Sequence, residues 1–528
     1  MSMAFSLTPL QQRDKKIKDL EIKLQNERNA RRNDREEFEY RCAQCKEKSE
    51  NNKSIIRMLQ RSIISRTKAI GKMRMIISGL KKRIAELEDK AAVLEGRIKK
   101  DSTNSGKPPS SDGFKKPRTF STRKKSGRKP GGQFGHKGYT LKVETEEKKI
   151  IERKEGVCSC GGEIKFGNKY ESRSIVDIRV TLFVVEERAY RGRCTVCGNH
   201  FKAAFSSGYM APVQYGSNIK ALVVMCNEYG NVPDKKTADI ISSICGNKIR
   251  MSTGTVANIR TVLANKLAST VQIIKQRLIE SGVLNVDETG VRVNGKLNWV
   301  NIFANERYTL FEHNQKRSAH CNDEDGILAF YTGILVHDHF RAYYKNKAAT
   351  HAECNQHILR YLKAVIEIQD HAWAKKMTEF LLSAKALKYE LMAAGQNSLK
   401  PEELAELKQK YIDILDEGDK EYQAATFGKK NIRRFREEYC LLMRLRKYQD
   451  EHLRFLSDFN APFGNHIAEH GAHFMKNKTR VSGGFRSVRG ADEHMAIASV
   501  ISTGKKQDKN IYLMIKDCFN GKTLFDSG

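Results

Sequence analysis

The sequence predicts a multidomain chain of the α+β class. Its 528 residues exceed what one hydrophobic core usually organises, so several domains in series are expected. A heptad pattern near the N-terminus indicates a long helix, whereas the apolar pattern after residue 282 changes to that of short strands. Two cysteine pairs lie between these regions and mark a further module.

The charge of the chain favours a polyanionic partner. There are 95 Lys and Arg residues against 62 Asp and Glu residues, a formal net charge of +33, and such a field attracts nucleic acid above most other partners. No segment has the roughly 20 apolar residues of a spanning helix, and the N-terminus lacks the order of a secretory signal. We therefore expect a cytoplasmic protein that binds no membrane.

Residues 1–100 are predicted to be helical, with a coiled coil over residues 56–98. One core position of the heptad is occupied by Ile56, Ile63, Ile70, Ile77, Ile84, Ala91 and Ile98. Its partner position is occupied by Leu59, Arg66, Met73, Leu80, Leu87 and Leu94. Isoleucine and leucine in this order favour a parallel two-stranded coil, so we expect a homodimer or higher oligomer. One long helix packed on its own protein is the alternative.

Residues 101–145 are predicted to form a basic linker rich in Gly, Pro and Ser. No acidic residue lies between Gly113 and Val143. Eight side chains there suit contacts with DNA phosphates: Lys115, Lys116, Arg118, Arg123, Lys124, Lys125, Arg128 and Lys129. A solvated tether is the other interpretation, and the two are compatible because such segments often become ordered on binding.

Residues 146–210 are predicted to form a zinc-ribbon-like β module. Two cysteine knuckles, each followed by glycine, enclose the β-rich residues 178–185, and their thiols belong to Cys158, Cys160, Cys194 and Cys197. Four thiolates can hold a structural Zn²⁺ tetrahedrally and leave no position for a catalytic water. The first knuckle is one residue shorter than the usual Cys-x-x-Cys.

Residues 211–280 are predicted to be a helical DNA-binding region. Residues 237–246 and 252–262 resemble two helices joined by a turn that contains glycine, with Ser252 as the N-cap of the second helix. This pattern suggests a helix-turn-helix. Plain helical packing is an equally good interpretation, because the pattern is loose.

The strand pattern after residue 282 is that of an RNase H-like sheet. Three strands at hairpin spacing are expected over residues 283–293, 297–304 and 307–312, followed by a helix-length stretch and a buried strand over residues 333–340. This order places Asp287 and Asp338 on neighbouring strands. Paired carboxylates of this kind can hold two divalent ions about 4 Å apart for phosphoryl displacement.

Five segments resemble sequences of one protein family. They read Asn-Ser-Gly-Lys-Pro-Pro-Ser-Ser-Asp at residues 104–112, Gly-Arg-Lys-Pro-Gly-Gly-Gln-Phe-Gly-His-Lys-Gly at 127–138, Asp-Glu-Thr at 287–289, Val-His-Asp at 336–338 and Val-Ser-Gly-Gly-Phe-Arg-Ser at 481–487. From about residue 100 to its end, the chain is similar to DDE-type transposases of the insertion sequence 66 family. The resemblance implies a DNA transposase that performs metal-dependent strand cleavage and strand transfer at the ends of a mobile element.

The resemblance also implies the remaining parts of the site. Glu469, in the segment Asn-His-Ile-Ala-Glu at residues 465–469, becomes the third acid beside Asp287 and Asp338, with Mg²⁺ or Mn²⁺ as the two ions. The catalytic domain then comprises residues 281–371 and 458–528, with a helical insertion at 372–457. Further phosphate contacts are expected from Lys476, Lys478, Arg480 and Arg486.

Two features near these acids have more than one interpretation. A Cys-x-x-His sequence at residues 354–357 resembles a signature of several transposase families, but no further zinc ligands can be named, so packing or hydrogen bonding near the site is preferred. His466, His470 and His473 share one helical face, and the family usually has arginines at the second and third of these positions. Weaker, pH-dependent positive groups are the plain interpretation, and a metal site is the other.

The expected partners are DNA, both at the element ends and at the target, and helper proteins encoded beside the element. The expected location is the bacterial nucleoid within the cytoplasm. A non-catalytic DNA-binding protein, a decayed transposase copy and a nuclease of the same fold remain as alternatives. Strand transfer distinguishes the transposase from the nuclease.

Overall fold

The computed structural model of this protein describes residues 21–36, 54–98, 148–156, 158–206, 211–317, 323–428 and 432–525, together with residues 100, 104, 135, 137 and 208. The chain divides into two compact units. Unit 1 contains Met1–Thr119 and Leu267–Lys509, and unit 2 contains Phe120–Lys266 and Asn510–Gly528. The chain combines helices with a mixed sheet, which confirms the α+β prediction at this level.

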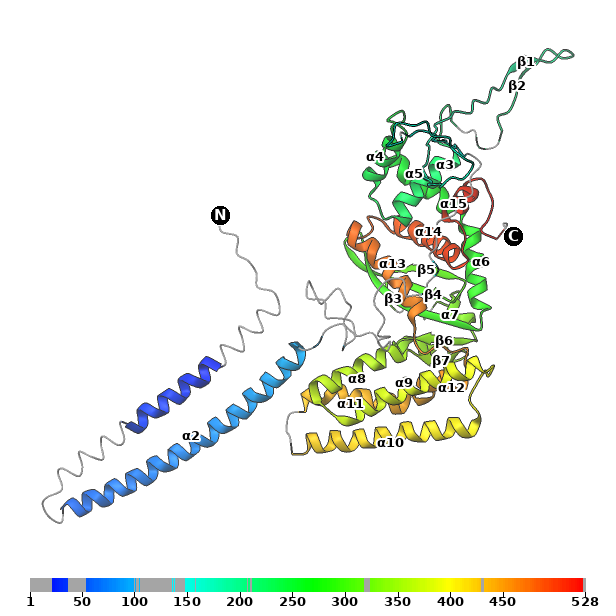
Figure 1. Ribbon diagram of the computed structural model, residues 1–528. Helices are drawn as coiled ribbons and strands as arrows, with labels where there is room; N and C mark the ends of the chain where they lie inside the picture. The colour runs from blue at the N-terminus through cyan, green and yellow to red at the C-terminus, as the bar shows by residue number, and fades with distance from the viewer. Residues whose placement is uncertain are drawn as a thin grey trace. The chain divides into compact units, whose positions relative to one another are not determined.

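Unit 1 is built on a five-stranded sheet with the order β5-β4-β3-β6-β7 (Figure 1). The strands are β3 (Val283–Val293), β4 (Lys296–Ala304), β5 (Thr309–Asn314), β6 (Ile334–His337) and β7 (Thr350–Glu353). β3, β4 and β5 form antiparallel hairpins, whereas β6 runs parallel to both β3 and β7. The alternating apolar pattern of residues 283–312 therefore gives the strands that it predicts.

The connection between β5 and β6 differs from the expectation of a helix-length stretch. Its described part contains only α7 (Ile327–Phe330), a helix of four residues. Gly326 precedes α7, and Tyr331 after it is extended. Buried side chains at both ends, Ile327 and Tyr331, account for an apolar pattern that does not require a longer helix.

Helices α13 (His466–Ser482) and α14 (Val488–Lys506) pack on the sheet. Valine, isoleucine and phenylalanine side chains of β3, β4 and β5 form one buried cluster with alanine and methionine side chains of these two helices. Gly471 allows the close approach of α13, because a Cβ atom at this position would lie 2.7 Å from Ile302 Cγ2. The cluster holds the start of α13 over the centre of β3.

The Val-Ser-Gly-Gly-Phe-Arg-Ser segment forms the turn between α13 and α14. Gly483 ends α13 in the left-handed conformation (φ 73°), and a Cβ on Gly484 would lie 2.5 Å from the Arg292 carbonyl oxygen. Phe485 then donates its backbone N–H to Arg292 O at 2.7 Å and accepts from Asn294 N at 2.8 Å. The two glycines therefore let the turn bind back onto the β3–β4 hairpin.

The edge strand β5 is covered by α14. The hydroxyl of Ser499 accepts the backbone N–H of Phe311 at 2.9 Å, and Thr503 Oγ1 accepts that of Thr309 at 3.0 Å. These side chains satisfy backbone groups that a free sheet edge would leave unpaired. A helix whose Ser499 follows Phe311 of β5 by 188 residues in the sequence is thereby fixed to the sheet.

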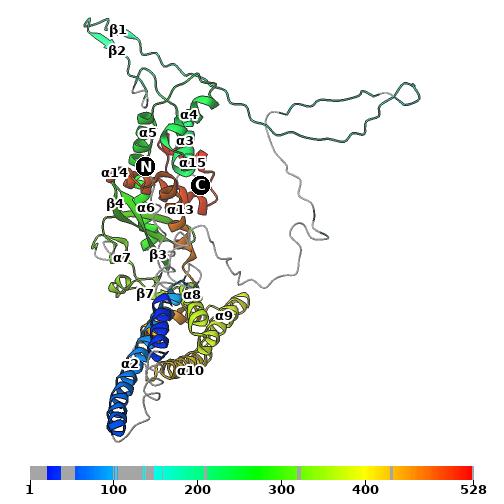
Figure 2. The ribbon, with the colours of Figure 1, turned by 90° about the vertical axis from the view of Figure 1, so that its left-hand side faces the viewer.

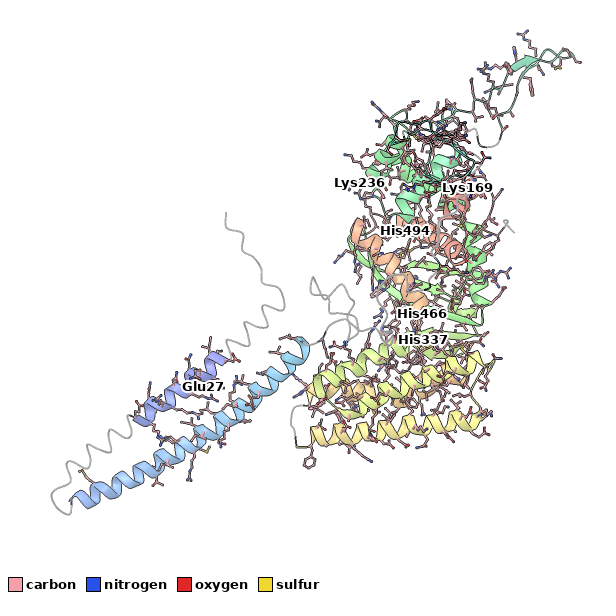
Figure 3. The ribbon with its side chains drawn as sticks, in the orientation of Figure 1. Glu27, Lys169, Lys236, His337, His466 and His494 are labelled. Atoms are coloured by element: carbon pink, nitrogen blue, oxygen red, sulfur yellow. The ribbon has the colours of Figure 1, made fainter. Side chains whose placement is uncertain are left out.

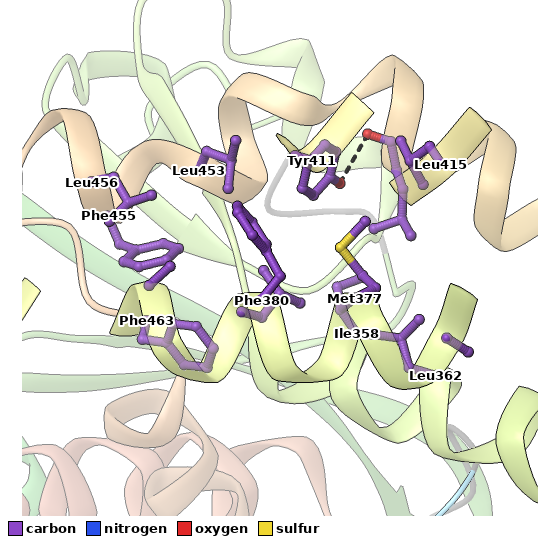
Figure 4. Close-up of a cluster of buried hydrophobic side chains, with 14 of the residues drawn as sticks. Ile358, Leu362, Met377, Phe380, Tyr411, Leu415, Leu453, Phe455, Leu456 and Phe463 are labelled. Atoms are coloured by element: carbon purple, nitrogen blue, oxygen red, sulfur yellow. Dashed lines mark hydrogen bonds between the residues drawn. The ribbon is translucent and has the colours of Figure 1, made fainter. Parts of the chain in front are cut away.

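A helical subdomain follows β7 in unit 1. It contains α8 (Asn355–Gln369), α9 (Ala372–Ala393), α10 (Pro401–Thr426), the short turn η5 (Arg433–Phe435), α11 (Arg436–Lys447) and α12 (Gln449–Ser457). The helices share one apolar core that includes Met377, Phe380 and Leu453 (Figure 4). Tyr411 is fully buried in it and donates its hydroxyl to Leu445 O at 3.1 Å.

Unit 2 contains helices that pack around α3 (Ser217–Val224). They are the π-helical turn η2 (Met225–Tyr229), α4 (Asp234–Ile244), α5 (Thr253–Lys266) and α15 (Ile511–Phe519). A separate hairpin consists of β1 (Arg191–Arg193) and β2 (His200–Lys202), as Figure 2 shows. Residues 178–185, expected to be β-rich, form no ladder with another described segment, so the β character of this region is limited to the hairpin.

Near the N-terminus, α2 (Ser54–Ile98) is a continuous helix of 45 residues. The helix is confirmed, whereas its assembly into a coiled coil stays a prediction. Unit 1 also contains helical residues 21–36, α6 (Ala268–Ile279), which packs against β5 and α14, and the 3-10 helix η4 (Arg341–Lys345). Within the described residues, the helices lack the combination of length and apolar character that crossing a bilayer requires.

Candidate active site

Three predicted acids lie together at the centre of the unit 1 sheet. Asp287 is in the middle of β3, Asp338 directly follows β6, and Glu469 is in the first turn of α13. Burial raises the pKa of Asp287 well above its usual range, and the nearby charges of Glu288, Asp338 and Glu469 raise it further. These electrostatic interactions indicate that the three carboxylates are neighbours, although their oxygen atoms do not form a group as close as that of Cys354, His357 and Glu469.

The sheet positions the two aspartates. β6 pairs with the first residues of β3 in parallel register, with Val283 opposite Ile334, so both strands point their carboxyl ends toward the same edge. Asp338 then accepts the backbone N–H of Phe340 on Oδ1 at 2.9 Å, and Asp287 accepts that of Glu288 at 2.8 Å. One oxygen of each carboxylate is thereby oriented by the backbone.

Asn465 fixes the third acid to the sheet. Its side-chain amide donates to Val286 O at 2.7 Å and accepts from Asn285 Nδ2 at 2.9 Å. Both asparagines are buried, and the carbonyl of Asn465 accepts the N–H of Glu469 at 3.1 Å. The asparagine before the acid therefore acts as a clamp between α13 and β3, a role that the sequence pattern alone did not reveal.

Glu288, next to Asp287, has its own cationic partner. Arg317 approaches it with Nη2 2.5 Å from Oε1, and Tyr343 donates its hydroxyl to Oε2 at 2.5 Å. The guanidinium of Arg317 also lies over the Phe340 ring, 4.3 Å from its centroid. Glu288 is thus held by an ion pair and a hydrogen bond beside the three acids, and no sequence motif indicated Arg317 or Tyr343.

The three acids have the chemistry of a site for a hard divalent cation. They offer only carboxylate oxygens, the ligands that Mg²⁺ and Mn²⁺ prefer. Oε1 of Glu469 is buried and has no hydrogen-bond partner among the described residues. A divalent ion would offset the repulsion that raises the pKa of Asp287. The donor set therefore fits the ions expected from the sequence.

A buried carboxylate ties the helical subdomain to this edge of the sheet. Glu353, the last residue of β7, pairs with Arg444 of α11 at 2.7 Å and with His339 at 2.5 Å, and accepts the Tyr344 hydroxyl at 2.6 Å. Burial alone would raise the pKa of Glu353, but the hydrogen bond with His339 and nearby positive groups hold it well below its usual range. Glu353 therefore remains charged and anchors α11 beside the residue that follows Asp338.

A further group of metal-binding atoms adjoins Glu469. Cys354 precedes α8, His357 is in its first turn, and one ligand atom from each of these residues and from Glu469 lies within 4.8 Å of the others. Burial raises the pKa of the Cys354 thiol to about 12, as does the charge of Glu469. Burial also lowers the pKa of His357. The interpretation of residues 354–357 as simple packing did not anticipate this grouping.

The predicted basic contacts have different positions. Lys476, Lys478 and Arg480 follow Glu469 on α13, and Arg486 lies in the turn after it. Arg480 and Arg486 are exposed, whereas the two lysines are half-buried. The eight basic residues between Lys115 and Lys129 lie outside the described residues, so their phosphate contacts stay a prediction.

Three histidines extend along the exposed face of α13. His466, His470 and His473 are exposed, and the rings of the first two lie 6.3 Å apart. Figure 3 labels His466, the first residue of α13, and His337, the last residue of β6. The group of metal-binding atoms formed by Cys354, His357 and Glu469 includes none of these histidines, so among the described residues they form a polar face outside that group.

The four predicted zinc ligands are brought together only in pairs. Cys158 Sγ lies 3.0 Å from Cys160 Sγ, and hydrogen bonds with Cys197 and Val196 lower the pKa of Cys194. The knuckle at residues 194–197 is the turn of the β1–β2 hairpin. Among the described residues the four cysteines do not come together as one metal-binding group. Zinc binding by these cysteines stays a prediction.

Helices α4 and α5 pack against each other in the predicted helix-turn-helix region. Ser252 accepts the backbone N–H of Thr255 at 3.1 Å, which confirms it as an N-cap. Residues 245–252 separate the helices, a longer connection than the 3–4 residues that are usual. Arg260 joins α5 to Glu228 at 3.4 Å, so one side of the second helix is engaged in internal packing.

Comparison with known proteins supplies two family matches. The family described as "Transposase IS66 family" matches residues 212–493, and a "Family of unknown function (DUF6444)" matches residues 47–142. The first match spans α3, η2, α4 and α5 of unit 2, the complete five-stranded sheet and α13 with Glu469. No curated protein matches the chain.

Proposed function

Because the chain belongs to the IS66 family of transposases, we propose that it cleaves and joins DNA strands at the ends of a mobile insertion element. Water and then a DNA 3′-hydroxyl would attack phosphodiesters at a site formed by Asp287, Asp338 and Glu469. Mg²⁺ or Mn²⁺ bound there would polarise the phosphate and lower the pKa of the attacking oxygen. The reaction needs no covalent enzyme intermediate.

The convergence of the three acids carries this proposal. They come from residues separated by up to 182 positions in the sequence, yet Asp338 and Glu469 both act electrostatically on Asp287. A stable core does not require such repulsion, since clustered carboxylates oppose folding unless a cation is present. The chain's own contribution is to orient the acids through β3, β6 and the Asn465 clamp.

The strand order supports assignment of the sheet to the RNase H-like class. The sheet contains three antiparallel strands followed by two parallel strands, in the order β5-β4-β3-β6-β7. This arrangement agrees with the strand order expected from the sequence, in which Asp287 and Asp338 belong to neighbouring strands. The helical subdomain after β7 then corresponds to an insertion between the second and third acids. These helices begin directly beside the acids, through Glu353 and Cys354, and can therefore position DNA close to the reaction.

Separate parts of the chain would hold the DNA. Arg480 and Arg486 are exposed after the proposed catalytic glutamate, and Lys115 to Lys129 would supply positive charge for phosphate contacts. The α4–α5 pair would contribute groove contacts, and the cysteine module would be stabilised by Zn²⁺. We also propose dimerisation through α2 and cooperation with helper proteins encoded beside the element.

The decisive experiment removes one acid at a time. Asp287→Asn, Asp338→Asn and Glu469→Gln are each expected to abolish cleavage of DNA carrying the native element end, because each loses a metal ligand but no phosphate contact. DNA affinity should stay near that of the unchanged protein. Sequencing the products in the presence of Mn²⁺ and gel-shift titration measure the two quantities.

Glu324→Gln is the matched control, because this exposed acid lies in the β5–β6 connection and should leave cleavage unchanged. A variant that loses one of the three acids but still cleaves would remove that acid from the site. Cleavage without strand transfer by the unchanged protein would instead identify a nuclease. DNA binding without any cleavage would identify a decayed copy or a non-catalytic DNA-binding protein.

A further inference from the structure

The structure places a mixed set of ligand atoms beside the three acids. Cys354 Sγ, a ring nitrogen of His357 and a carboxylate oxygen of Glu469 all lie within 4.8 Å of one another, and His357 Nδ1 is 3.7 Å from Glu469 Oε1. Ligands of a tetrahedral zinc ion, with bonds of about 2.0–2.3 Å, lie roughly 3.3–3.8 Å apart. Small side-chain adjustments would therefore close this set around an ion.

Two of these atoms are buried polar atoms without a hydrogen-bond partner among the described residues. These atoms are His357 Nδ1 and Glu469 Oε1. They face each other at a distance too long for a hydrogen bond. An unpaired buried polar atom costs about 1–3 kcal/mol, and a cation between the two would satisfy both at once.

The ligands come from the starts of two helices. Cys354 is the N-cap of α8, His357 follows three residues later in the first turn, and Glu469 is in the first turn of α13. The Cys354 sulfur also accepts the backbone N–H of Asn465 at 3.2 Å. One residue of the clamp thus contacts both the sheet and the cysteine, so the spacing between the two helices is well defined.

We propose that Cys354, His357 and Glu469 bind a thiophilic transition-metal ion such as Zn²⁺. A thiolate and an imidazole select such an ion over Mg²⁺, which prefers oxygen ligands only. Binding converts the Cys354 thiol to a thiolate and releases its proton to solvent. Three protein ligands leave one coordination position for water.

This site would control the orientation of Glu469. A carboxylate has two oxygens, so Glu469 can contact the transition-metal ion with Oε1 while its other oxygen remains for the Mg²⁺ or Mn²⁺ site. This consequence rests on the proposed transposase activity, whereas binding of the transition metal does not depend on it. The two ideas therefore need separate measurements.

The test measures metal content rather than cleavage. The full chain is stripped of metal and titrated with Co²⁺ and then Zn²⁺, with thiolate-to-cobalt absorption and elemental analysis as readouts. Cys354→Ser keeps an acceptor for the Asn465 N–H but removes the thiolate, and it should lose one ion per chain. His357→Gln should lose the same ion, while Cys440→Ser, at an exposed cysteine of α11, should lose none.

The zinc knuckles contribute equally to all these proteins, so they cancel in the comparison. Equal metal content in the unchanged chain, Cys354→Ser and His357→Gln would overturn the proposal and leave Cys354 as a helix cap only. If Cys354→Ser fails to fold by circular dichroism, His357→Gln decides the result. Asp287→Asn should retain the ion although it abolishes cleavage, which separates this proposal from the proposed function.

Discussion

At the scale of single residues, Asn465 determines where Glu469 lies. It is four positions before the glutamate, and it contacts the Val286 carbonyl, the Asn285 amide and the Cys354 sulfur. Its role is one of positioning, because these partners are structural groups and not reacting atoms. The precision of the proposed metal site would therefore depend on a neutral side chain.

We predict that Asn465→Ala lowers cleavage about 100-fold, since a displacement of roughly 1 Å at a catalytic group has effects of that size. The free energy of unfolding should fall by about 1–3 kcal/mol, because buried partners lose their hydrogen bonds. Cleavage assays over a range of Mn²⁺ concentrations and thermal unfolding check both effects. Higher Mn²⁺ should restore part of the activity, which a purely structural defect would not allow.

Asn460→Ala provides the control, because Asn460 is an exposed residue shortly before α13 and should change neither quantity. If Asn465→Ala kept normal cleavage, the clamp would not position Glu469.

Buried histidines predict how stability depends on pH. Burial lowers the pKa of His337 to about 4 and that of His452 to about 3, and both side chains are fully buried. In the unfolded chain a histidine has a pKa of about 6.5. Between these values the unfolded chain binds protons that the folded chain excludes, so stability falls as the pH falls from about 6.5 to 4.

The expected loss between pH 7 and pH 5 is about 2 kcal/mol for each histidine. Thermal unfolding of the full chain at both pH values measures it. His337→Gln should reduce this loss even if it lowers stability at pH 7, whereas His200→Gln, at an exposed position of β2, should not. An unchanged pH dependence in His337→Gln would contradict the assignment of a neutral, buried imidazole.

At the scale of elements, α2 presents apolar residues that the chain does not bury by itself. Ile70 and Ile77 are 45% and 43% exposed, and Met73 is 39% exposed. These side chains belong to the two core positions of the heptad, and exposure of such a stripe is unfavourable unless a second helix covers it. The exposed stripe of α2 therefore favours dimerisation through this helix.

We predict that Ile77→Lys shifts the full chain toward monomer, because the lysine would place a charge in the centre of the seam. Met75→Lys is the matched control: it adds the same charge at a more exposed position, 76% accessible, on the opposite face of the helix. Sedimentation at tens of micromolar, about where a six-heptad coil should associate, compares the two. A monomeric unchanged protein would rule out the coil, and equal effects of both substitutions would indicate charge repulsion alone.

At the scale of the whole molecule, the net charge of +33 is the dominant electrostatic feature. The segment from Lys115 to Lys129 concentrates eight positive side chains in 15 residues. Rigid, bidentate side chains are needed to read bases, whereas mobile lysines and arginines gain affinity mainly from counterion release. This segment should therefore strengthen binding to any DNA.

Neutralising Lys115, Lys116, Arg123 and Lys124 should weaken binding to the element ends and to random DNA about equally. The slope of log K against log salt should flatten by about three to four units, as measured by fluorescence titration. The control removes the same charge from the helical subdomain at Lys375, Lys408, Lys410 and Lys420 and should change the slope less. A loss confined to the element ends, with an unchanged slope, would identify a sequence reader.

The sequence by itself determined the features that depend on local pattern. Alternating apolar residues predict β3, β4 and β5, and an apolar run that ends in an acid predicts β6 with Asp338 at its tip, because backbone geometry and burial act over a few neighbouring residues. The heptad likewise predicted α2. Between β5 and β6 the described residues contain a helix of only four residues instead of the expected longer one, since short apolar runs do not distinguish a helix from a buried turn.

Only the tertiary structure decided how distant residues meet. Family resemblance pointed to Glu469, but its position depends on Asn285 and Asn465, which lie 180 positions apart. The sequence pattern likewise did not predict that Glu288 meets Arg317 or that Cys354 lies close to Glu469. The Asn465 and Cys354 contacts arise where α13 packs against the sheet and meets the start of α8, whereas Arg317 reaches Glu288 from the segment after β5. The direction of a side chain across such an interface is set by the packing of whole elements rather than by the neighbours of that residue in the sequence.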